Sequence, residues 1–178
     1  MIVKAPNEIL SKRCETLRRH NYVGIANTFI KKSWKHRDGA CGIAANQINM
    51  PYRLFIGKMN KGGKHQFWKI FINPRIVIKP SSTKIGGWFP INEECLSIPG
   101  KSYNTIREDH ITIVYRDMDF KIVWATYDNM NARIIQHEVD HLNGTLISDI
   151  HQTEFGLEKH KSINKEVSWL YYNTSSIN

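Results

Sequence analysis

The sequence predicts an α+β fold in which mostly antiparallel sheets pack around a central metal-binding helix. Two runs rich in β-branched and aromatic residues, 52–57 and 67–78, are typical of strands. Two alternating segments, 110–116 and 120–126, flank a short turn and predict a β-hairpin. Residues 128–141 then change to helical spacing. Strands followed by a helix, without regular βαβ alternation, indicate the α+β class.

The helix predicted at 128–141 has residue types that mark both of its ends. Asp128 or Asn129 can cap the N-terminus, and Gly144 is typical of a helix C-terminus. The apolar stripe of this helix consists of Ile134, Ile135, Val139 and Leu142. A looser helical pattern covers 16–35, and Pro74 predicts an edge or a bulge in the second strand run.

The length of 178 residues predicts a single domain over 1–178, long enough to bury a sizeable core. Short linker-like segments occur at 60–64, 80–87 and 97–104. Residues 151–178 are expected to form a divergent C-terminal extension. A weakly amphipathic pattern at 154–172 predicts a terminal helix within it.

Composition places the chain among globular proteins, since 41% of the residues are hydrophobic and 23% are charged. The sequence predicts no transmembrane helix, because no window of about 18 apolar residues exists, and residues 1–15 lack a signal-peptide core. Cys14, Cys41 and Cys95 are too few for a disulfide framework. We therefore expect a reduced, cytoplasmic protein with no membrane contact. Its net charge of +9 suits an anionic partner, although a solvated basic surface is the simpler explanation.

The strongest chemical signal is the motif His137-Glu138-Val139-Asp140-His141. Residues four apart share one face of a helix, so the two imidazoles can bind one ion. The glutamate beside the first histidine can reach a water molecule on that ion and act as its base. Such short motifs also occur by chance on surface helices, but the apolar stripe directs this helix inward.

A catalytic metal site of this kind needs a third protein ligand. Ile147 stands where the extended metalloprotease motif requires a histidine, which excludes that class. Glu158 or Glu166 could complete the site of a zinc peptidase. Cys95 is the better candidate, because a thiolate and two imidazoles form a tetrahedral set with one open position. Taken alone, a cysteine is more often a small core hydrophobe, and this interpretation covers the other two cysteines.

The segment 39–47 is rich in small residues, which let the backbone approach another group closely. Gln47, at its end, offers a side-chain amide that could donate to a developing oxyanion. The alternative is a tight helix start that carries a surface glutamine.

These three pieces resemble the peptide deformylase family, which carries GxGxAAxQ, EGCLS and QHExDH motifs in that order. The corresponding segments of this chain are 40–47, 93–97 and 136–141. Weaker similarity at 6–10, 72–74 and 142–149 extends the resemblance over about residues 6–150. Ala40 replaces the first glycine of its motif, which an ordinary backbone φ would tolerate.

The resemblance implies a metal-dependent hydrolase that removes the formyl group from N-formylmethionine at the N-terminus of nascent polypeptides and releases formate. It implies Cys95, His137 and His141 as the ligands of one divalent metal ion. That ion would be Fe²⁺ in the cell, while Zn²⁺, Ni²⁺ and Co²⁺ suit the same donors.

The resemblance also assigns roles around the metal. Glu138 would carry the proton, and the Gln47 amide and the Leu96 backbone N–H would bind the developing oxyanion. Residues expected to orient the ligands are Glu93, Arg107, Gln136 and Asp140.

The implied substrate is a formylmethionyl peptide that lies extended beside Cys41 and Gly42, with Ile134 in the methionine pocket. Glu94 replaces the glycine before the cysteine of its motif and puts a charge at the cleft, which bears on substrate preference. We expect a monomer, with the ribosome near the nascent-chain exit as a further partner.

Two alternatives stay open at this point. One is a zinc metallopeptidase of the HExxH type, and the other is a basic RNA- or ribosome-binding protein with a structural metal. Four protein ligands would favour the structural metal, whereas an open coordination position would count against it.

Overall fold

Antiparallel strands and a few helices make up the computed structural model, which describes residues 1–61, 65–77 and 91–150. The short 3₁₀ helices are η1 (Glu8–Leu10), η2 (Trp34–His36) and η3 (Ala45–Ile48), and the α-helices are α1 (Tyr22–Ser33), α2 (Asn129–Asn143) and α3 (Ile147–Ile150). The strands are β1 (Gly42–Ala44), β2 (Leu54–Lys61), β3 (His65–Val77), β4 (Ile91–Cys95), β5 (Ile98–Thr105), β6 (His110–Arg116) and β7 (Ile122–Asp128). The predicted α+β class with mostly antiparallel sheets is confirmed.

Five strands form the larger sheet, in the order β1-β2-β3-β6-β7. Strands β6 and β7 are the predicted hairpin. The pairing of β3 with β6 shifts its register between Ile72 and Arg75, which confirms the bulge predicted at Pro74. Strand β1 lies at one edge, so its outer side has no strand neighbour among the described residues.

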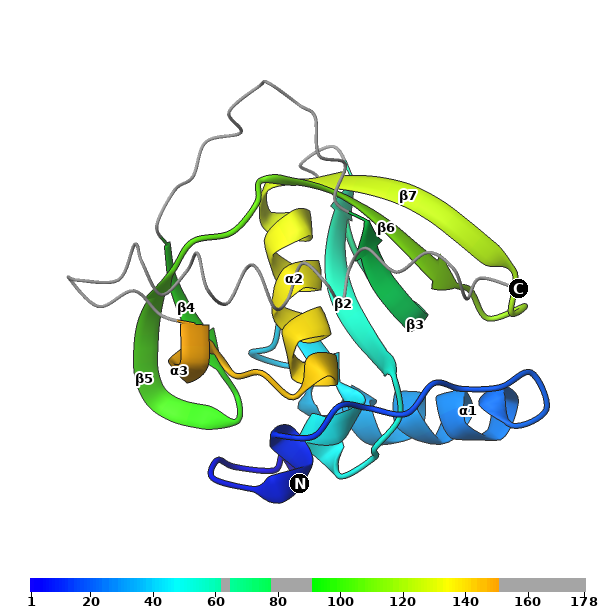
Figure 1. Ribbon diagram of the computed structural model, residues 1–178, viewed down its shortest axis with the longest axis horizontal. Coiled ribbons are helices and arrows are strands. Elements are labelled where there is room, and N and C mark those ends of the chain that lie inside the picture. Colours follow the sequence, from blue (N-terminus) through cyan, green and yellow to red (C-terminus); the bar gives the residue numbers. More distant parts are fainter. Residues whose placement is uncertain (62–64, 78–90, 151–178) are drawn as a thin grey trace.

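The two faces of this sheet pack against different helices, because successive side chains of a strand point to opposite faces. Leu54 and Ile56 of β2 pack with Phe29 of α1 in one core cluster. Phe55, between them, packs with Phe71 and with the apolar stripe of α2 in the other cluster. Helix α2 therefore lies between two parts of the fold: the larger sheet is on one side of the helix, and the β4–β5 pair is on the other side (Figure 1).

Helix α2 ends as the sequence predicts. Gly144 adopts the left-handed conformation, with φ 79°, and its N–H bonds to carbonyl groups of the last helical turn. A Cβ at this position would lie 2.7 Å from the backbone of Ser11, so glycine also permits the close approach of the N-terminal segment.

Helix α1 begins at Tyr22, later than the predicted start at 16. The reason lies in the sheet, where Asn73 binds the backbone of Leu17 on both sides. The Leu17 N–H donates to Asn73 Oδ1 at 2.9 Å, and Asn73 Nδ2 donates to the Leu17 carbonyl at 2.8 Å. This pair holds Leu17 beside the sheet, although its apolar side chain fits a helical pattern.

The prediction of a linker at 97–104 is wrong, because most of it forms strand β5, which pairs with β4. Both strands are mostly exposed and polar, so they lack the β-branched and aromatic residues that indicate strands. The segment 60–61 is the end of β2 rather than a linker. The other predicted linker, 80–87, and the terminal helix at 154–172 lie outside the described residues.

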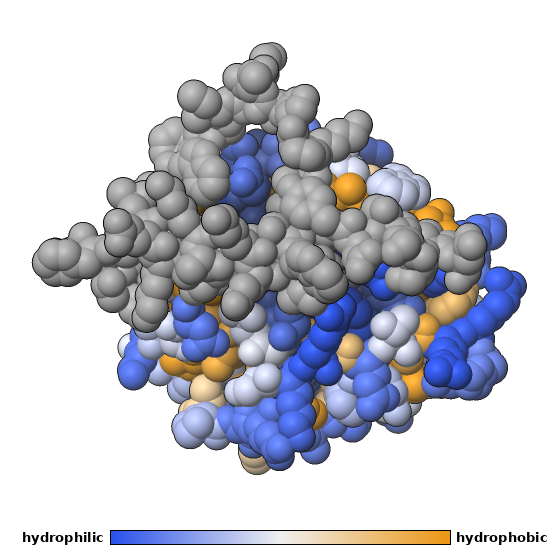
Figure 2. Space-filling view, viewed as in Figure 1, coloured by the Kyte–Doolittle hydropathy of each residue, from blue (hydrophilic) through white to orange (hydrophobic). Residues whose placement is uncertain are grey.

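None of the described helices is long and apolar enough to span a bilayer. The described part of the face in Figure 2 is largely hydrophilic, with separate hydrophobic areas between the polar side chains.

Candidate metal centre and active site

Cys95 reaches the interior because it ends strand β4. Strand alternation turns Glu93 and Cys95 to the same buried side, while Glu94 between them points to the exposed side. The β4–β5 register shifts at Glu94 and Cys95, where the hairpin closes. Two donors surround the sulfur: the backbone N–H of Ser97 at 3.4 Å and Gln47 Nε2 at 3.7 Å. Cysteine binds metals in its thiolate form, and both of these donors point at the atom that would bind the ion.

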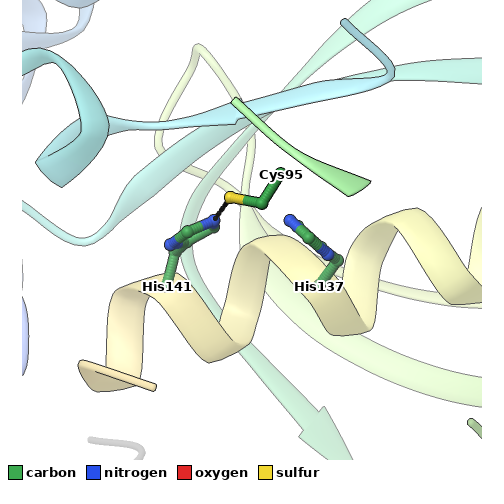
Figure 3. Close-up of side chains that lie close together, drawn as sticks. All are labelled: Cys95, His137 and His141. Atoms are coloured by element: carbon green, nitrogen blue, oxygen red, sulfur yellow. Dashed lines mark hydrogen bonds between the residues drawn. The ribbon is translucent and has the colours of Figure 1, made fainter. Parts of the chain in front are cut away.

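His137 and His141 project from successive turns of α2 toward that sulfur (Figure 3). One ligand atom from each of Cys95, His137 and His141 lies within 4.8 Å of the others. The sulfur is 3.2 Å from Nε2 of His141. A thiolate and two imidazoles suit a tetrahedral transition-metal ion with one position open to a water molecule, so the residues present fit one metal ion.

The two rings differ in charge because their neighbours differ. Burial holds the pKa of His141 well below its usual value, and the nearby charge of His137 adds to this. Burial also opposes protonation of His137, but hydrogen bonds to Cys95 and Glu93 outweigh it and raise its pKa to about 10. A cation bound here would therefore take the place of a proton on His137.

Glu93 lies behind His137 and binds its other ring nitrogen, since Oε2 is 3.1 Å from Nδ1. Arg107 binds both oxygens of this carboxylate, at 3.0 and 2.9 Å, and also binds Asp140. Burial alone would raise the pKa of Glu93, but the bonds to His137 and Arg107 hold it well below its usual range. The structure thus brings Glu93, Arg107 and Asp140 together beside the ligands.

Gln136 is placed differently. Its side chain binds the backbone N–H and carbonyl of Glu108 at 3.1 and 2.7 Å, and also the carbonyl of Ala132. None of the bonds described for it reaches a ligand of the metal site. Gln136 therefore connects α2 to the segment that follows Arg107.

Glu138 is buried, with 3% of its surface exposed. Its Oε2 has no hydrogen-bond partner among the residues that the structure describes. Burial raises the pKa of this carboxyl to about 7. Gly42 of β1 packs against it so closely that a Cβ there would lie 2.7 Å from Cδ of Glu138. Glycine is therefore the residue that this position accommodates beside the carboxylate.

Gln47 is held by the turn that contains it. Its Oε1 accepts from the backbone N–H of Ala44 at 2.9 Å, which directs Nε2 toward Cys95 and toward Ser97 Oγ at 3.2 Å. Its side chain is buried, which contradicts the alternative of a surface glutamine. The neighbouring Asn46 donates to the carbonyl of His141 at 2.6 Å and ties this turn to the end of α2.

A cleft of about 670 Å³ opens beside these groups. Its lining includes all four residues expected at the substrate and also Leu96: Cys41, Gly42, Glu94, Leu96 and Ile134. Cys41 is exposed, so its interpretation as a core hydrophobe is wrong, whereas Cys14 is buried as predicted. Gly39 takes the left-handed conformation and Ala40 does not, which explains how alanine replaces the first glycine of the motif.

Arg133 belongs to the same group of side chains, although no sequence motif marks it as part of the site. It lines the cleft, and its Nη1 donates to Oε1 of Glu93 at 2.8 Å. The available signal was its position four residues before His137, which places both side chains on one face of α2.

A cysteine and two helix histidines lie beside an open cleft on an α+β scaffold, and together they form a candidate centre for one metal ion. The chain belongs to the polypeptide deformylase family, whose model matches residues 1–154.

Individual relatives show the same similarity. A peptide deformylase of Chlorobaculum tepidum is 37% identical over 108 residues, or 61% of this chain and 56% of the relative, so the chain spans little more than half the length of that protein. A peptide deformylase of Borreliella burgdorferi is 34% identical over 149 residues, 83% of this chain and 84% of the relative. The crystal structure of peptide deformylase from Thermotoga maritima is similar with a TM-score of 0.69 and 26% identity, covering 86% of this chain and 97% of that one.

Proposed function

We propose that this protein hydrolyses the formyl group from N-formylmethionyl peptides and releases formate. The observation that carries the proposal is the convergence of Cys95, His137 and His141 within 4.8 Å, with Glu138 in the lining of the same cleft. Membership of the polypeptide deformylase family supports the same reaction.

Cys95, His137 and His141 would hold the metal ion. Such an ion would lower the pKa of a water molecule to about 7 and polarise the formyl carbonyl. We propose Fe²⁺ as the ion used in the cell, and the same donors accept Zn²⁺, Ni²⁺ or Co²⁺.

Glu138 is suited to moving the proton. Its pKa near 7 lets the carboxylate accept a proton from water and release it again at neutral pH. The water oxygen adds to the formyl carbon, the carbon–nitrogen bond breaks, and Glu138 passes its proton to the leaving amine. Oε2, which has no hydrogen-bond partner among the described residues, would accept this proton.

Gln47 and Leu96 would stabilise the oxygen on which negative charge develops. The Gln47 amide is fixed by Ala44 before any substrate binds, so its donor needs little reorganisation. Leu96 lies in the cleft wall directly after Cys95, where its backbone N–H can serve as a second donor.

The substrate peptide would pair with the outer edge of β1 at Gly42 and with the preceding Cys41 through main-chain hydrogen bonds. Ile134 lines the cleft and suits the methionine side chain. Glu94 is exposed at the same cleft, and its charge would favour peptides with a basic residue after the methionine.

The remaining parts of the proposal concern the cellular setting. We propose a cytoplasmic monomer formed by one domain, in which Asp140 supports the ligands through Arg107 and Gln136 holds α2 at Glu108. The net charge of +9 is consistent with work near the anionic surface of the ribosome, at the exit of nascent chains. The peptidase alternative would need Glu158 or Glu166, which lie outside the described residues, whereas we propose Cys95 as the third ligand because it lies near both histidines.

A formate-release assay tests the proposal. Formyl-Met-Ala-Ser is incubated with protein loaded anaerobically with Fe²⁺ and, separately, with Zn²⁺, while acetyl-Met-Ala-Ser serves as the matched control. We expect formate from the formyl peptide and no product from the acetyl peptide. Absence of formate with either metal would refute the proposal, and cleavage of an internal peptide bond would favour the peptidase.

A further inference from the structure

Arg133 connects the cleft with the carboxylate that binds His137. Its side chain is 11% exposed and lines the cleft. Its Nη1 donates to Oε1 of Glu93 at 2.8 Å and to Oγ1 of the buried Thr105 at 3.3 Å. The guanidinium group is therefore hydrogen-bonded to Glu93, and Glu93 is in turn hydrogen-bonded to the ring of His137.

From the residues that the structure describes, the carboxylate of Glu93 accepts four hydrogen bonds, two on each oxygen. Arg107 supplies one to each, and Arg133 and His137 supply the remaining two, to Oε1 and Oε2 respectively. Arg133 and His137 are four residues apart in α2, so one carboxylate bridges two successive turns of the helix. Because both oxygens are held from two sides, the plane of the carboxylate is fixed, and it in turn orients the imidazole.

Arg133 also balances the charge of this buried group. Arg107 alone would face two carboxylates, Glu93 and Asp140. Arg133 adds the second positive charge on the side of the cleft. Buried carboxylates are stable only where such charges and hydrogen bonds compensate them, so a loss of Arg133 would weaken the compensation of the Glu93 charge beside the ligand.

We propose that Arg133 is a positioning residue for the metal ligand His137 and acts through Glu93. This inference rests on the proposed metal site. It predicts that Arg133 controls how firmly His137 holds the ion, although the arginine itself touches neither the ion nor the reacting atoms.

The test uses the full chain loaded with Co²⁺, whose visible absorption reports the geometry of its ligands. Arg133→Met removes the charge and the donors while keeping an unbranched side chain. We expect Co²⁺ to pass to a chelator about tenfold faster, near the lower end of the range known for lost outer partners of metal ligands, together with a changed absorption spectrum. Arg133→Lys should give an intermediate rate, because it restores the charge without the planar fork.

Asn131→Ala is the matched control on the same helix. Asn131 exchanges two hydrogen bonds with the backbone of Asn60, at 2.9 and 2.8 Å, and is on the side of β2 rather than of Glu93. Its loss loosens α2 without touching the carboxylate. We expect the control to keep the wild-type spectrum and rate of release.

Each other result overturns the inference. Wild-type release and spectrum in Arg133→Met would show that Glu93 needs no help from the arginine. Equal effects of Asn131→Ala and Arg133→Met would show a general loosening of the helix. Failure of the wild-type chain to bind Co²⁺ would overturn both the inference and the proposed function, whereas Co²⁺ binding without any formate release would refute the function alone.

Discussion

One added methyl group at Gly42 should disable the site without removing any of the proposed functional groups. A Cβ at this position lies 2.7 Å from both Cγ and Cδ of Glu138, about 0.7 Å closer than the 3.4 Å at which ordinary contact begins. Glu138 is only 3% exposed, and the space beside it is the cleft that it lines. In Gly42→Ala, therefore, either the carboxylate or strand β1 must move by most of that distance.

Two magnitudes follow from this overlap. Overpacking of a buried site costs about 1–3 kcal/mol of folding stability. A displacement approaching 1 Å in a group that transfers a proton costs on the order of 10²-fold in rate. The nearest atoms to the new Cβ all belong to Glu138, so the metal content should stay at the wild-type level.

The assay combines kcat for formate release, metal analysis and urea unfolding. Gly24→Ala is the control, because Gly24 lies in α1 and a Cβ there meets no atom within 4 Å. It should keep full activity and gain about 0.5–1 kcal/mol of stability. In a Glu138→Ala background the overlap disappears, so the stability cost of Gly42→Ala should largely vanish. Wild-type kcat in Gly42→Ala, or an equal stability cost in both backgrounds, would refute the reasoning.

Three further predictions concern the proton carrier, the metal ligand and the fold. Glu138→Ala should keep its metal and lose about 10²–10⁴ in kcat, measured beside metal analysis, and an active variant would exclude Glu138 as the proton carrier. Cys95→Ala should lose its metal on dialysis, because two imidazoles alone do not complete a site, and full retention would contradict the ligand assignment. Asn73→Ala should lower the free energy of unfolding by about 1–3 kcal/mol, because the Leu17 backbone loses both of its partners. Its specific activity below the unfolding transition should be unchanged, and an unaltered urea midpoint would contradict this account of the start of α1.

Local patterns were sufficient where structure depends on neighbours in sequence. The hairpin of β6 and β7 follows from the alternation of apolar and polar residues. The bulge at Pro74 follows from the missing N–H of proline. The end of α2 follows from the left-handed conformation of Gly144. The stripe from Ile134 to Leu142 is buried as predicted, because helical spacing alone places it on one face.

Prediction failed where a distant partner decides the conformation. Leu17 belongs to a helical pattern, yet Asn73, far along the chain, binds its backbone and delays the helix. The sequence does not predict strands β4 and β5, because most of their residues are polar and exposed. These strands form because they pair with each other and turn a few residues, such as Glu93, into the interior. Arg133 was missed for the same reason, since its partner Glu93 is 40 positions away in sequence.

The amino-acid sequence alone determined which chemical groups the site can use. It contains two imidazoles at helical spacing, a carboxylate between them, and the small residues around Gly42. Helical geometry guarantees that His137 and His141 share a face, because the repeat of the backbone is fixed by local hydrogen bonds. Only the folded chain decided that the sulfur of Cys95 meets these rings and that Arg133 joins Glu93. Such contacts depend on how β4 packs against α2, and packing between distant segments is set by the whole core rather than by any local repeat.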